Sequence, residues 1–337
     1  MYTHGGERAV IRVHFTSADL ARVRIAVLGP LAETQLSFWV AQHNGEAALF
    51  DAWRSQARPR LSVGDLPGLV RGLAPARQRM VDLFTLVGTA PEMEDALDLL
   101  LSDPRPLRDE LALYRRGRRL MLPPWMLCAS TGDGRAARHA AEALTTAYQA
   151  TIARHWPRMR AALHREQDTA MRALACGGIG QMLSSLHPAI RWRPPLLEVD
   201  YRPLARGTDV HLTGGGMVIA PSVFCRSPRL YVGRSEELML IYPVLRSVLA
   251  AAEVFGGAGK SQAVAELLGR TRAAVLEAAE GSLTTGEIAR RLGVSPASAS
   301  QHTSVLREAG LISSHRQGKT VHHTITSLGK ALLDGHF

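Results

Sequence analysis

Apolar and polar residues follow a helical period in the stretch that ends at Gly293. Ile288 and Leu292 lie on one face, one turn apart, and the positions between them are mostly polar. Thr284 precedes this pattern and Glu287 follows it three residues later, which is the spacing of a capping box. Gly293 is placed to end the helix in a left-handed conformation. The pattern therefore predicts a short amphipathic helix with both ends defined.

A second helix is predicted directly after the first, over residues 295–309. Ser295 is a suitable N-cap, and Pro296 stands at the first helical position, where its missing N–H costs nothing. Gly310 marks the end of this helix. Two helices joined by so short a turn form a helix-turn-helix.

The residues that follow predict a two-stranded wing and a closing helix. A strand opens at Leu311-Ile312, Gln317-Gly318 makes a turn, and the β-branched run Thr320–Thr326 returns beside the first strand. The wing proper covers residues 313–320. The run LGKALL then forms a helix that Thr326 or Ser327 can cap.

The run SPASASQHTSVLREAGLI, followed by RQGKTVHHTITSLGKALL, resembles the winged-helix domain of ArsR-type bacterial transcription regulators. The resemblance covers about the last quarter of the chain. It implies that helix 295–309 enters the major groove of DNA and that wing 313–320 also contacts DNA. The alternative is a winged helix that serves only protein contacts. Thr303 departs from the leucine that the family usually has at the matching core position.

The candidate DNA-binding residues lie on the outward face of helix 295–309 and on the wing. Helical spacing turns Ala299, Thr303 and Leu306 toward the core, which leaves the polar face near the N-terminus exposed. On that face a glutamine can pair with adenine through two hydrogen bonds, and serines can donate to phosphates or base edges. The candidates are Ser295, Ala297, Ser298, Ser300, Gln301, His302, Ser304, Arg316 and Lys319.

Metal sensing is a further property of some ArsR-type proteins, and the residues here do not support it. The family's metal sensors carry a cysteine pair in the first helix of the helix-turn-helix, where this chain reads TTGEIARRLG. His322 and His323 are adjacent on a strand, so their side chains point to opposite faces. We therefore expect no metal and no other cofactor.

The whole chain is predicted to be of the α+β class. Residues 1–255 form an N-terminal domain that is helical over 1–176 and β-rich over 190–245, with a small antiparallel sheet of four to six strands. Residues 262–337 form the winged helix-turn-helix domain, whose first helix is expected over 264–279. Two smaller features are also expected, a division of the long helical stretch at Pro157 and a linker over Gly256–Ser261.

Composition narrows the class of protein more than it identifies a function. The length of 337 residues fits about two domains, and 46% apolar with 21% charged residues is ordinary for a globular protein. The net charge of +10 is a weak sign of DNA binding, because residues 262–337 carry only eight basic against six acidic side chains. No stretch is apolar enough for a membrane span or a signal peptide, so we expect a cytoplasmic location.

The N-terminal domain offers several chemical features but no catalytic constellation. The basic run Arg115–Arg119 is explained most simply as exposed helix charge, and TGGGMVIAP as a hairpin turn. Three distant cysteines are expected to be reduced thiols. Tryptophans could line an apolar pocket, although they more often belong to the core.

These observations together predict a sequence-specific transcriptional regulator, most simply a repressor, that binds double-stranded DNA as a homodimer. The contact between the two copies is expected from helix 264–279 or from the N-terminal domain, and any small-molecule effector is expected to act on the N-terminal domain. The alternatives from other classes are an enzyme or an interaction scaffold that carries the winged helix as an appendage.

Overall fold

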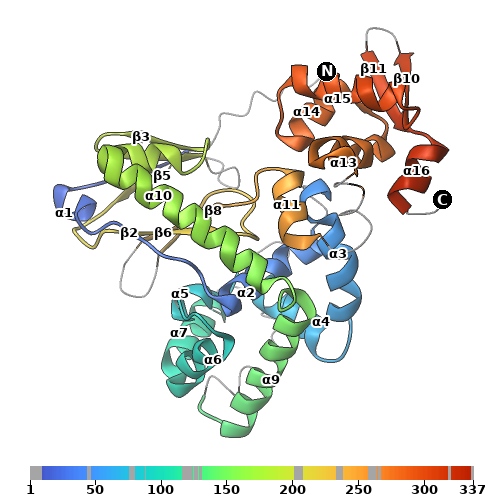
Figure 1. The fold of residues 1–337 in the computed structure, drawn as a ribbon. Helices are drawn as coiled ribbons and strands as arrows, with labels where there is room; N and C mark the ends of the chain where they lie inside the picture. The colour runs from blue at the N-terminus through green and yellow to red at the C-terminus, as the bar shows by residue number, and fades with distance from the viewer. Residues whose placement is uncertain are drawn as a thin grey trace, which may run out of the picture. The chain divides into compact units, whose positions relative to one another are not determined.

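The computed structural model describes residues 10–43, 47–75, 80–87, 89–115, 124, 128, 131–200, 208–232, 238–256, 264, 267–317 and 320–334. Within it the chain divides into two compact units, one of residues 1–45 and 54–244 and the other of residues 46–53 and 245–337. Helices and strands carry the labels of Figure 1. The expected linker, from residue 257 onward, lies outside the described residues.

The described part of the first unit contains most of the helices and eight strands. Its helices are α1 (Ser17–Leu20), α2 (Pro30–Gln42), most of α3 (Ala47–Leu61), α4 (Leu66–Leu73), α5 (Phe84–Val87), α6 (Met93–Ser102), α7 (Pro104–Arg115), α9 (Gly134–Thr151) and α10 (Trp156–Ser185). Its strands are β1 (Val10–His14), β2 (Arg24–Ile25), β3 (Ile190–Arg193), β4 (Leu196–Asp200), β5 (Thr208–His211), β6 (Met217–Ser222), β7 (Arg229–Val232) and β8 (Leu238–Pro243).

Helix α2 is the buried centre of the helical part of this unit. Eleven of its residues are buried, and it contacts α4, α5, α6 and α9. A helix that is enclosed on all sides must find partners for the carbonyl groups at its C-terminal end. Arg54 Nε donates to the Val40 carbonyl at 3.0 Å, and Arg58 Nε donates to the Ala41 carbonyl at 2.7 Å. These two cations also match the negative end of the helix dipole.

The long helical stretch after residue 134 is divided where the sequence predicts. Helix α9 ends at Thr151, and α10 begins at Trp156 with Pro157 in its first turn. Proline lacks the N–H that a continuous helix would need there, so the prediction of a break is confirmed. Helix α10 is interrupted again at Gly178, where the backbone has φ 72° and ψ −173°. Only glycine adopts that conformation without strain.

The strands correct the prediction of one small antiparallel sheet. They form two four-stranded sheets, in the orders β3-β4-β1-β5 and β2-β6-β8-β7. Strand β1 pairs with β5 in parallel and with β4 antiparallel, and β6 pairs in parallel with both β2 and β8. The prediction failed because β1 and β2 come from the first 25 residues, far from the β-rich stretch in the sequence.

The loop before β6 also differs from its prediction. The glycine run was expected to turn a hairpin, but β5 and β6 belong to different sheets. The loop is held instead by Asp19 Oδ1, which accepts the N–H of Gly214 at 2.7 Å and that of Gly216 at 3.1 Å. Burial raises the pKa of Asp19, but these bonds and two from Thr16 outweigh it, so the pKa is lowered overall.

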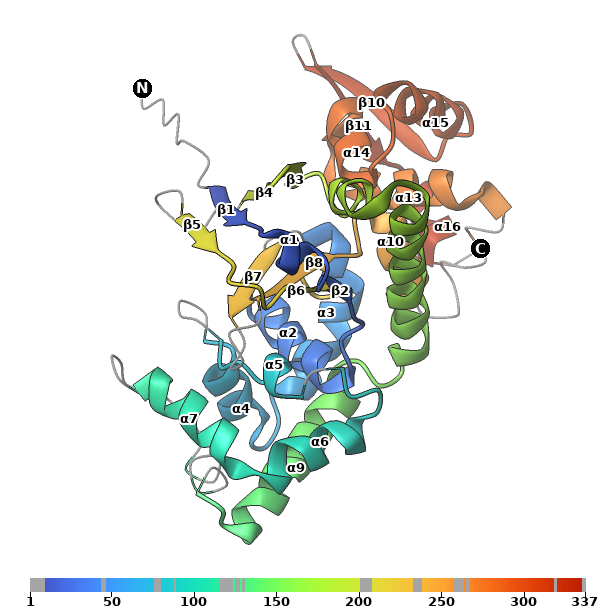
Figure 2. The same cartoon turned by 90° about the vertical axis from the view of Figure 1, so that its left-hand side faces the viewer.

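One apolar core joins both sheets to α10. Inward residues of the first sheet, such as Val13 and Leu197, meet Ile219 and Leu240 of the second sheet and Leu183 of α10. Figures 1 and 2 both show α10 running alongside the strands. The alternation of buried residues along β4 reflects this single covered face, whereas β6 and β8 are buried throughout.

The second unit is a winged helix to which α11 (Val248–Phe255) and the first part of α3 are added. These two helices meet through aromatic side chains, since the ring centroids of Phe50 and Trp53 of α3 lie 6.0 and 6.3 Å from that of Phe255. The remaining elements of the unit are α13 (Arg270–Ala278), the 3-10 turn η1 (Ala279–Gly281), β9 (Leu283–Thr284), α14 (Thr285–Leu292), α15 (Pro296–Glu308), β10 (Ile312–Gln317), β11 (Thr320–Ile325) and α16 (Ser327–Asp334). The strand order is β10-β11-β9.

The first helix of the winged domain is shorter than the sequence predicts. A continuous helix over 264–279 was expected, but Gly269 has φ 83° and stands before α13, which begins at Arg270. A left-handed residue cannot continue an α-helix, and glycine adopts that conformation easily. Val264 still belongs to the winged-helix core, although it lies before the break.

Candidate nucleic-acid interface

The two helices of the helix-turn-helix begin and end through local contacts. Thr284 Oγ1 accepts the N–H of Glu287 at 3.3 Å, and Glu287 Oε2 accepts the N–H of Thr284 at 2.8 Å, so the capping box is confirmed. The backbone N–H and the hydroxyl of Thr284 both donate to the Glu287 carboxylate, and these two bonds lower its pKa. Gly293 ends α14 with φ 70°, and Ser295 caps α15 by accepting the N–H of Ser298 at 3.1 Å.

Helix α15 buries the side that its sequence predicts. Ala299 and Leu306 are buried in the core that also contains residues of α13 and α14. Thr303 is buried at the position where leucine is usual in the resembled family. Its hydroxyl donates to the carbonyl of Ser300 at 3.0 Å, so no polar group is left without a partner. The family difference at Thr303 is therefore accommodated within the helix.

The other side of α15 presents small and polar groups to solvent. Among the candidate DNA-binding residues, Ser295, Ala297, Ser300 and Gln301 are exposed, and Ser298, His302 and Ser304 are half-buried. The exposed residues cluster in the first two turns of the helix. A serine- and glutamine-rich face of this kind can approach base edges closely, because no bulky side chain stands in front of it.

Two of the half-buried candidates have less freedom than the sequence suggests. Ser304 Oγ accepts a hydrogen bond from Arg307 at 3.0 Å and lies 3.3 Å from Glu308 Oε1, to which it donates. His302 Nδ1 is buried and has no hydrogen-bond partner among the described residues. His302 therefore has only its Nε2 atom to offer to an external ligand.

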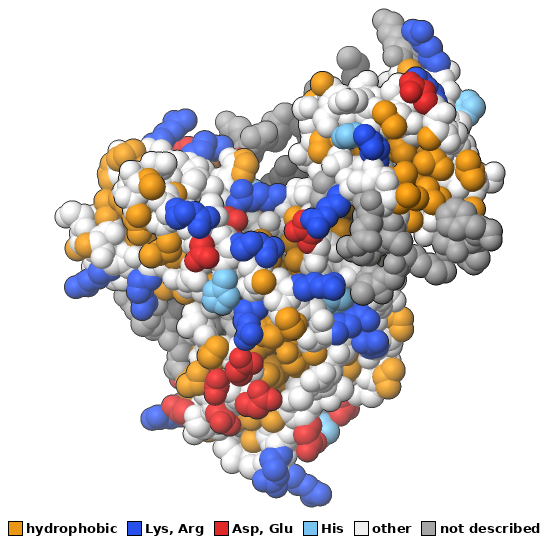
Figure 3. Space-filling view, viewed as in Figure 1, with side chains coloured by type: hydrophobic (Ala, Val, Ile, Leu, Met, Phe, Trp, Pro, Cys, Tyr) orange, Lys and Arg blue, Asp and Glu red, His pale blue; other side chains and the backbone are white. Residues whose placement is uncertain are grey.

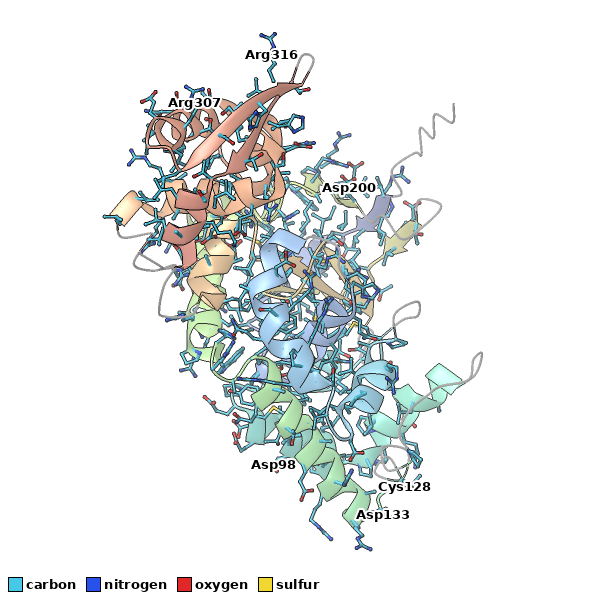
Figure 4. The ribbon with its side chains drawn as sticks, turned by 90° about the vertical axis from the view of Figure 1, so that its right-hand side faces the viewer. Asp98, Cys128, Asp133, Asp200, Arg307 and Arg316 are labelled. Carbon is cyan, nitrogen blue, oxygen red and sulfur yellow. The ribbon has the colours of Figure 1, made fainter. Side chains whose placement is uncertain are left out.

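The wing is a regular antiparallel hairpin. Ile312 pairs with Ile325 and Gln317 with Thr320 at its two ends. Arg316 is exposed and extends outward near the tip of the hairpin (Figure 4). Lys319, the second wing candidate, lies outside the described residues. A basic side chain at the wing tip is suited to a phosphate contact.

Sequence reasoning missed a buried histidine that joins the wing to the helix-turn-helix. His323 on β11 has Nε2 2.8 Å from Thr285 Oγ1 at the start of α14 and Nδ1 2.9 Å from Ser314 Oγ on β10. Burial, with smaller effects of Arg307 and His322, lowers the pKa of His323. A neutral imidazole therefore connects three elements. Side chains alternate between the two faces of the strand TVHHTIT, so one of its two histidines must face inward. This pattern could have predicted a buried histidine in the wing.

The histidine pair is arranged as the strand pattern predicts. His323 is buried, whereas His322 faces the other side, with Nδ1 3.4 Å from the Ser282 carbonyl. Among the described residues, no group of three or more His, Cys, Asp or Glu side chains is arranged to hold a metal ion. None of the helices in the described part of the chain has the length and apolar character needed to cross a membrane.

Comparison with known proteins identifies the C-terminal region. Residues 271–314 match the family model described as "Bacterial regulatory protein, arsR family". No curated protein and no solved structure matches the chain. The C-terminal region is an ArsR-type helix-turn-helix domain, and the chain therefore carries the DNA-binding domain of a transcription regulator. The match does not extend to the preceding residues, so the first unit has no family assignment.

Proposed function

We propose that this protein is a sequence-specific repressor that reads the major groove with the N-terminal half of α15 and contacts the adjacent backbone with the wing. The main support for this proposal is the exposed polar face of α15. The opposite side of the helix packs in the core, so the polar face is held toward solvent. A regulator of this kind acts where the chromosome lies, so we propose a cytoplasmic location.

The candidate residues have different roles in this proposal. Gln301 reads a base, since its amide can donate to and accept from adenine. Ser298 and Ser300 donate to phosphates or base edges, and Arg316 and Lys319 contact phosphates from the wing. Ser295 and Ala297 lie at the start of α15, where the backbone can approach DNA closely. Ser304 and His302 contribute less, because one is engaged by its own helix and the other is half-buried.

Replacing Gln301 with alanine is expected to weaken binding to the specific site by about 1–3 kcal/mol. The cause is the loss of two hydrogen bonds to one base, so the sequence preference at that base pair should also relax. Gel-shift titration with the protein's own upstream region, and with variants of the bound site, measures both effects.

Two further variants make this test specific. Gln181→Ala on α10 makes the same chemical change at an exposed position of the first unit, and it should leave DNA affinity unchanged. Arg316→Ala should weaken binding to all sequences alike. It should also lower the slope of log affinity against log salt concentration by about one. Unchanged affinity and unchanged base preference in Gln301→Ala would show that α15 does not read DNA as proposed.

We also propose that the protein binds DNA as a homodimer, since one winged helix covers too few base pairs for useful specificity. Leu267 and Leu328 in the second unit are 72% and 54% exposed, which is unusual for such large apolar side chains. Figure 3 shows apolar side chains gathered on the face that carries α13 and α16. This surface supports the proposal of a contact between two copies on the face that carries α13 and α16.

Light scattering at micromolar concentration is expected to give twice the chain mass of 36.6 kDa. Leu328→Ser should shift the equilibrium toward the monomer because it removes exposed apolar area from the contact surface. Val63→Ser in the first unit, where the side chain is 67% exposed, is the matched control. A monomer mass both with and without operator DNA would contradict the dimer.

A further inference from the structure

The wing is joined to the rest of its domain near its base. Ile312, in the first pair of the hairpin, lies in the apolar core, and β11 pairs with β9 through His322 and His323. His323 also stands opposite Ser314, in the third of the six pairs that lead from the base of the hairpin to its tip. The outer half of the hairpin, which carries Arg316, lies beyond this pair. A small rotation at the third pair would therefore displace the tip by a larger distance.

The side chain of His323 connects the hairpin to the helix-turn-helix. Its Nε2 atom lies 2.8 Å from Oγ1 of Thr285, the first residue of α14, and its Nδ1 atom lies 2.9 Å from Oγ of Ser314 on β10. Only 4% of His323 is exposed, so water competes little for these bonds. Helix α14 in turn packs against α15, the helix proposed to read bases. One imidazole ring therefore links the orientation of the wing to that of α15.

A neutral ring suits this site better than a charged one. Neutral imidazole donates from one nitrogen and accepts at the other, whereas the charged ring must donate from both. The charged groups that act on His323 are Arg307 of α15 and His322 of its own strand, and both are basic. On the neighbouring elements, Glu287 of α14 is engaged in the cap of its own helix, His315 of β10 stands opposite His322, and β9 has no titratable side chain. Burial first, and then the two basic groups, lower the pKa of His323.

We propose that His323 is a positioning residue of the wing, which holds the hairpin at a fixed angle to α14 so that Arg316 and α15 meet the same stretch of DNA. The two hydroxyl contacts supply the restraint, and the loss of either one allows the outer half of the hairpin to move. That this position serves DNA binding rests on the proposed function. The restraint of the hairpin does not, and it can be tested without DNA.

Hydrogen exchange of the full chain without DNA tests the restraint. Thr285→Val removes one hydroxyl and keeps the shape of the side chain, so amides of residues 313–317 and 320–325 should exchange about 5- to 100-fold faster. Amides of α15 should be unchanged, because its packing in the core is not altered. Thr146→Val is the matched control, since this exposed hydroxyl of α9 bonds within its own helix. Unchanged exchange in the wing, or equal acceleration in the wing and in α15, would overturn the proposal.

A pH profile distinguishes His323 from a residue that only fills space. An open hairpin exposes the ring to water, where it takes up a proton below about pH 6.5, whereas the closed hairpin resists that proton. The closed hairpin is therefore favoured above this pH and weakened as the pH falls below it. His323→Gln keeps a donor and an acceptor but does not titrate. The ratio of wing exchange rates in the wild type and in this variant should rise several-fold from about pH 7.5 to 5.5, and by about tenfold at most. A constant ratio would show that the proton of His323 does not act on the wing and would overturn the proposal.

Gel shifts with the protein's own upstream region test what the wing position does for DNA binding. Thr285→Val should lower the slope of log affinity against log salt concentration by about one, which is about a fivefold loss of affinity at roughly 0.15 M salt. Adding Arg316→Ala to this variant should cost less than about twofold, because the displaced arginine no longer contacts a phosphate. The base preference conferred by Gln301 should persist, since α15 is not displaced.

The two experiments separate this inference from the proposed function. If the hairpin loosens in Thr285→Val but the salt slope and affinity remain those of the wild type, the restraint stands and its role in DNA binding is refuted. If the wild type binds no DNA under any condition, the repressor proposal fails, while hydrogen exchange still decides whether His323 holds the wing. Additive effects of Thr285→Val and Arg316→Ala would overturn the proposed link between His323 and the position of Arg316.

Discussion

Glu33→Ala is expected to lower the free energy of unfolding of the first unit by about 3–5 kcal/mol at pH 5. The side chain is fully buried, and both of its oxygens accept backbone N–H groups from the turn after β6. Alanine leaves those two donors without a partner in the core and also leaves a cavity. Urea denaturation followed by tryptophan fluorescence reports mainly on this unit, since Trp39, Trp156 and Trp192 lie in it, whereas Trp53 lies in the second unit.

The same residue makes stability depend on pH. Burial raises the pKa of Glu33 from 4.5 to about 7, against the opposing effects of the bonds from Val223, Phe224 and Ser222. The folded chain therefore holds this proton more tightly than the unfolded chain does. The stabilisation by protonated Glu33 is fully present below about pH 4.5 and is lost as the pH rises to about 7. The free energy of unfolding falls by a total of roughly 3 kcal/mol over this range.

Glu33→Gln is the control for this dependence. Its amide oxygen still accepts one N–H, and it cannot ionise, so the pH-dependent loss should be absent from the variant. The free energy of unfolding is plotted against pH for the wild type and for Glu33→Gln, and one curve is subtracted from the other. The subtraction removes the opposite contribution of His323, whose lowered pKa makes stability rise with pH. The same slope between pH 5 and 7 in the wild type and in Glu33→Gln would exclude Glu33 as the source.

Gly329→Ala is expected to destabilise the winged unit by about 2–4 kcal/mol. A Cβ atom at this position of α16 would overlap the carbonyl oxygen of Leu311 and lie 2.9 Å from Ile325 Cγ1. The Leu311 carbonyl cannot move aside freely, because it also accepts the N–H of Thr326 at 3.1 Å. Thr326 Oγ1 in turn caps α16 through the N–H of Gly329 at 3.1 Å. Repulsion should therefore displace both the helix and its cap.

Hydrogen exchange of peptides from residues 270–334 measures this effect, and the slowest amides should exchange roughly 30- to 1000-fold faster in Gly329→Ala. Gly286→Ala is the matched control in the same unit, because a Cβ there meets nothing within 4 Å. Alanine is also the better helix former, so this variant should be unchanged or up to about 1 kcal/mol more stable. Similar exchange in the two variants would contradict the predicted overlap.

The winged domain could be predicted because its boundaries depend on local chemistry. The capping box at Thr284, the left-handed Gly293 and the N-cap Ser295 are each recognisable within a few residues, and all three are confirmed. The helical period also identified the buried side of α15. The break at Gly269 was missed because a glycine inside an apolar helical pattern is compatible with either outcome.

The first unit could not be predicted to the same depth, because its organisation depends on contacts between distant residues. Strand β1 has no local partner, and its parallel neighbour begins at Thr208. Glu33 looks like an ordinary helix residue until the turn at Val223 is brought beside it. The same holds for Trp39, whose ring lies near the guanidinium groups of Arg226 and Arg229, nearly 190 residues further along the chain. No local sequence pattern predicts contacts between residues that are so far apart in the chain.

The central position of β1 in its sheet has a consequence for synthesis of the protein on the ribosome. His14 is aligned with His211, so this edge of the sheet cannot close until roughly 200 further residues have been made. At about 5–20 residues per second, β1 waits on the order of 10–40 s, and its apolar residues are open to chaperones during that time. The helix-turn-helix depends on neighbours in sequence and can fold soon after it emerges. The winged domain, although it is translated after the first unit, therefore needs less time to fold once its residues have emerged.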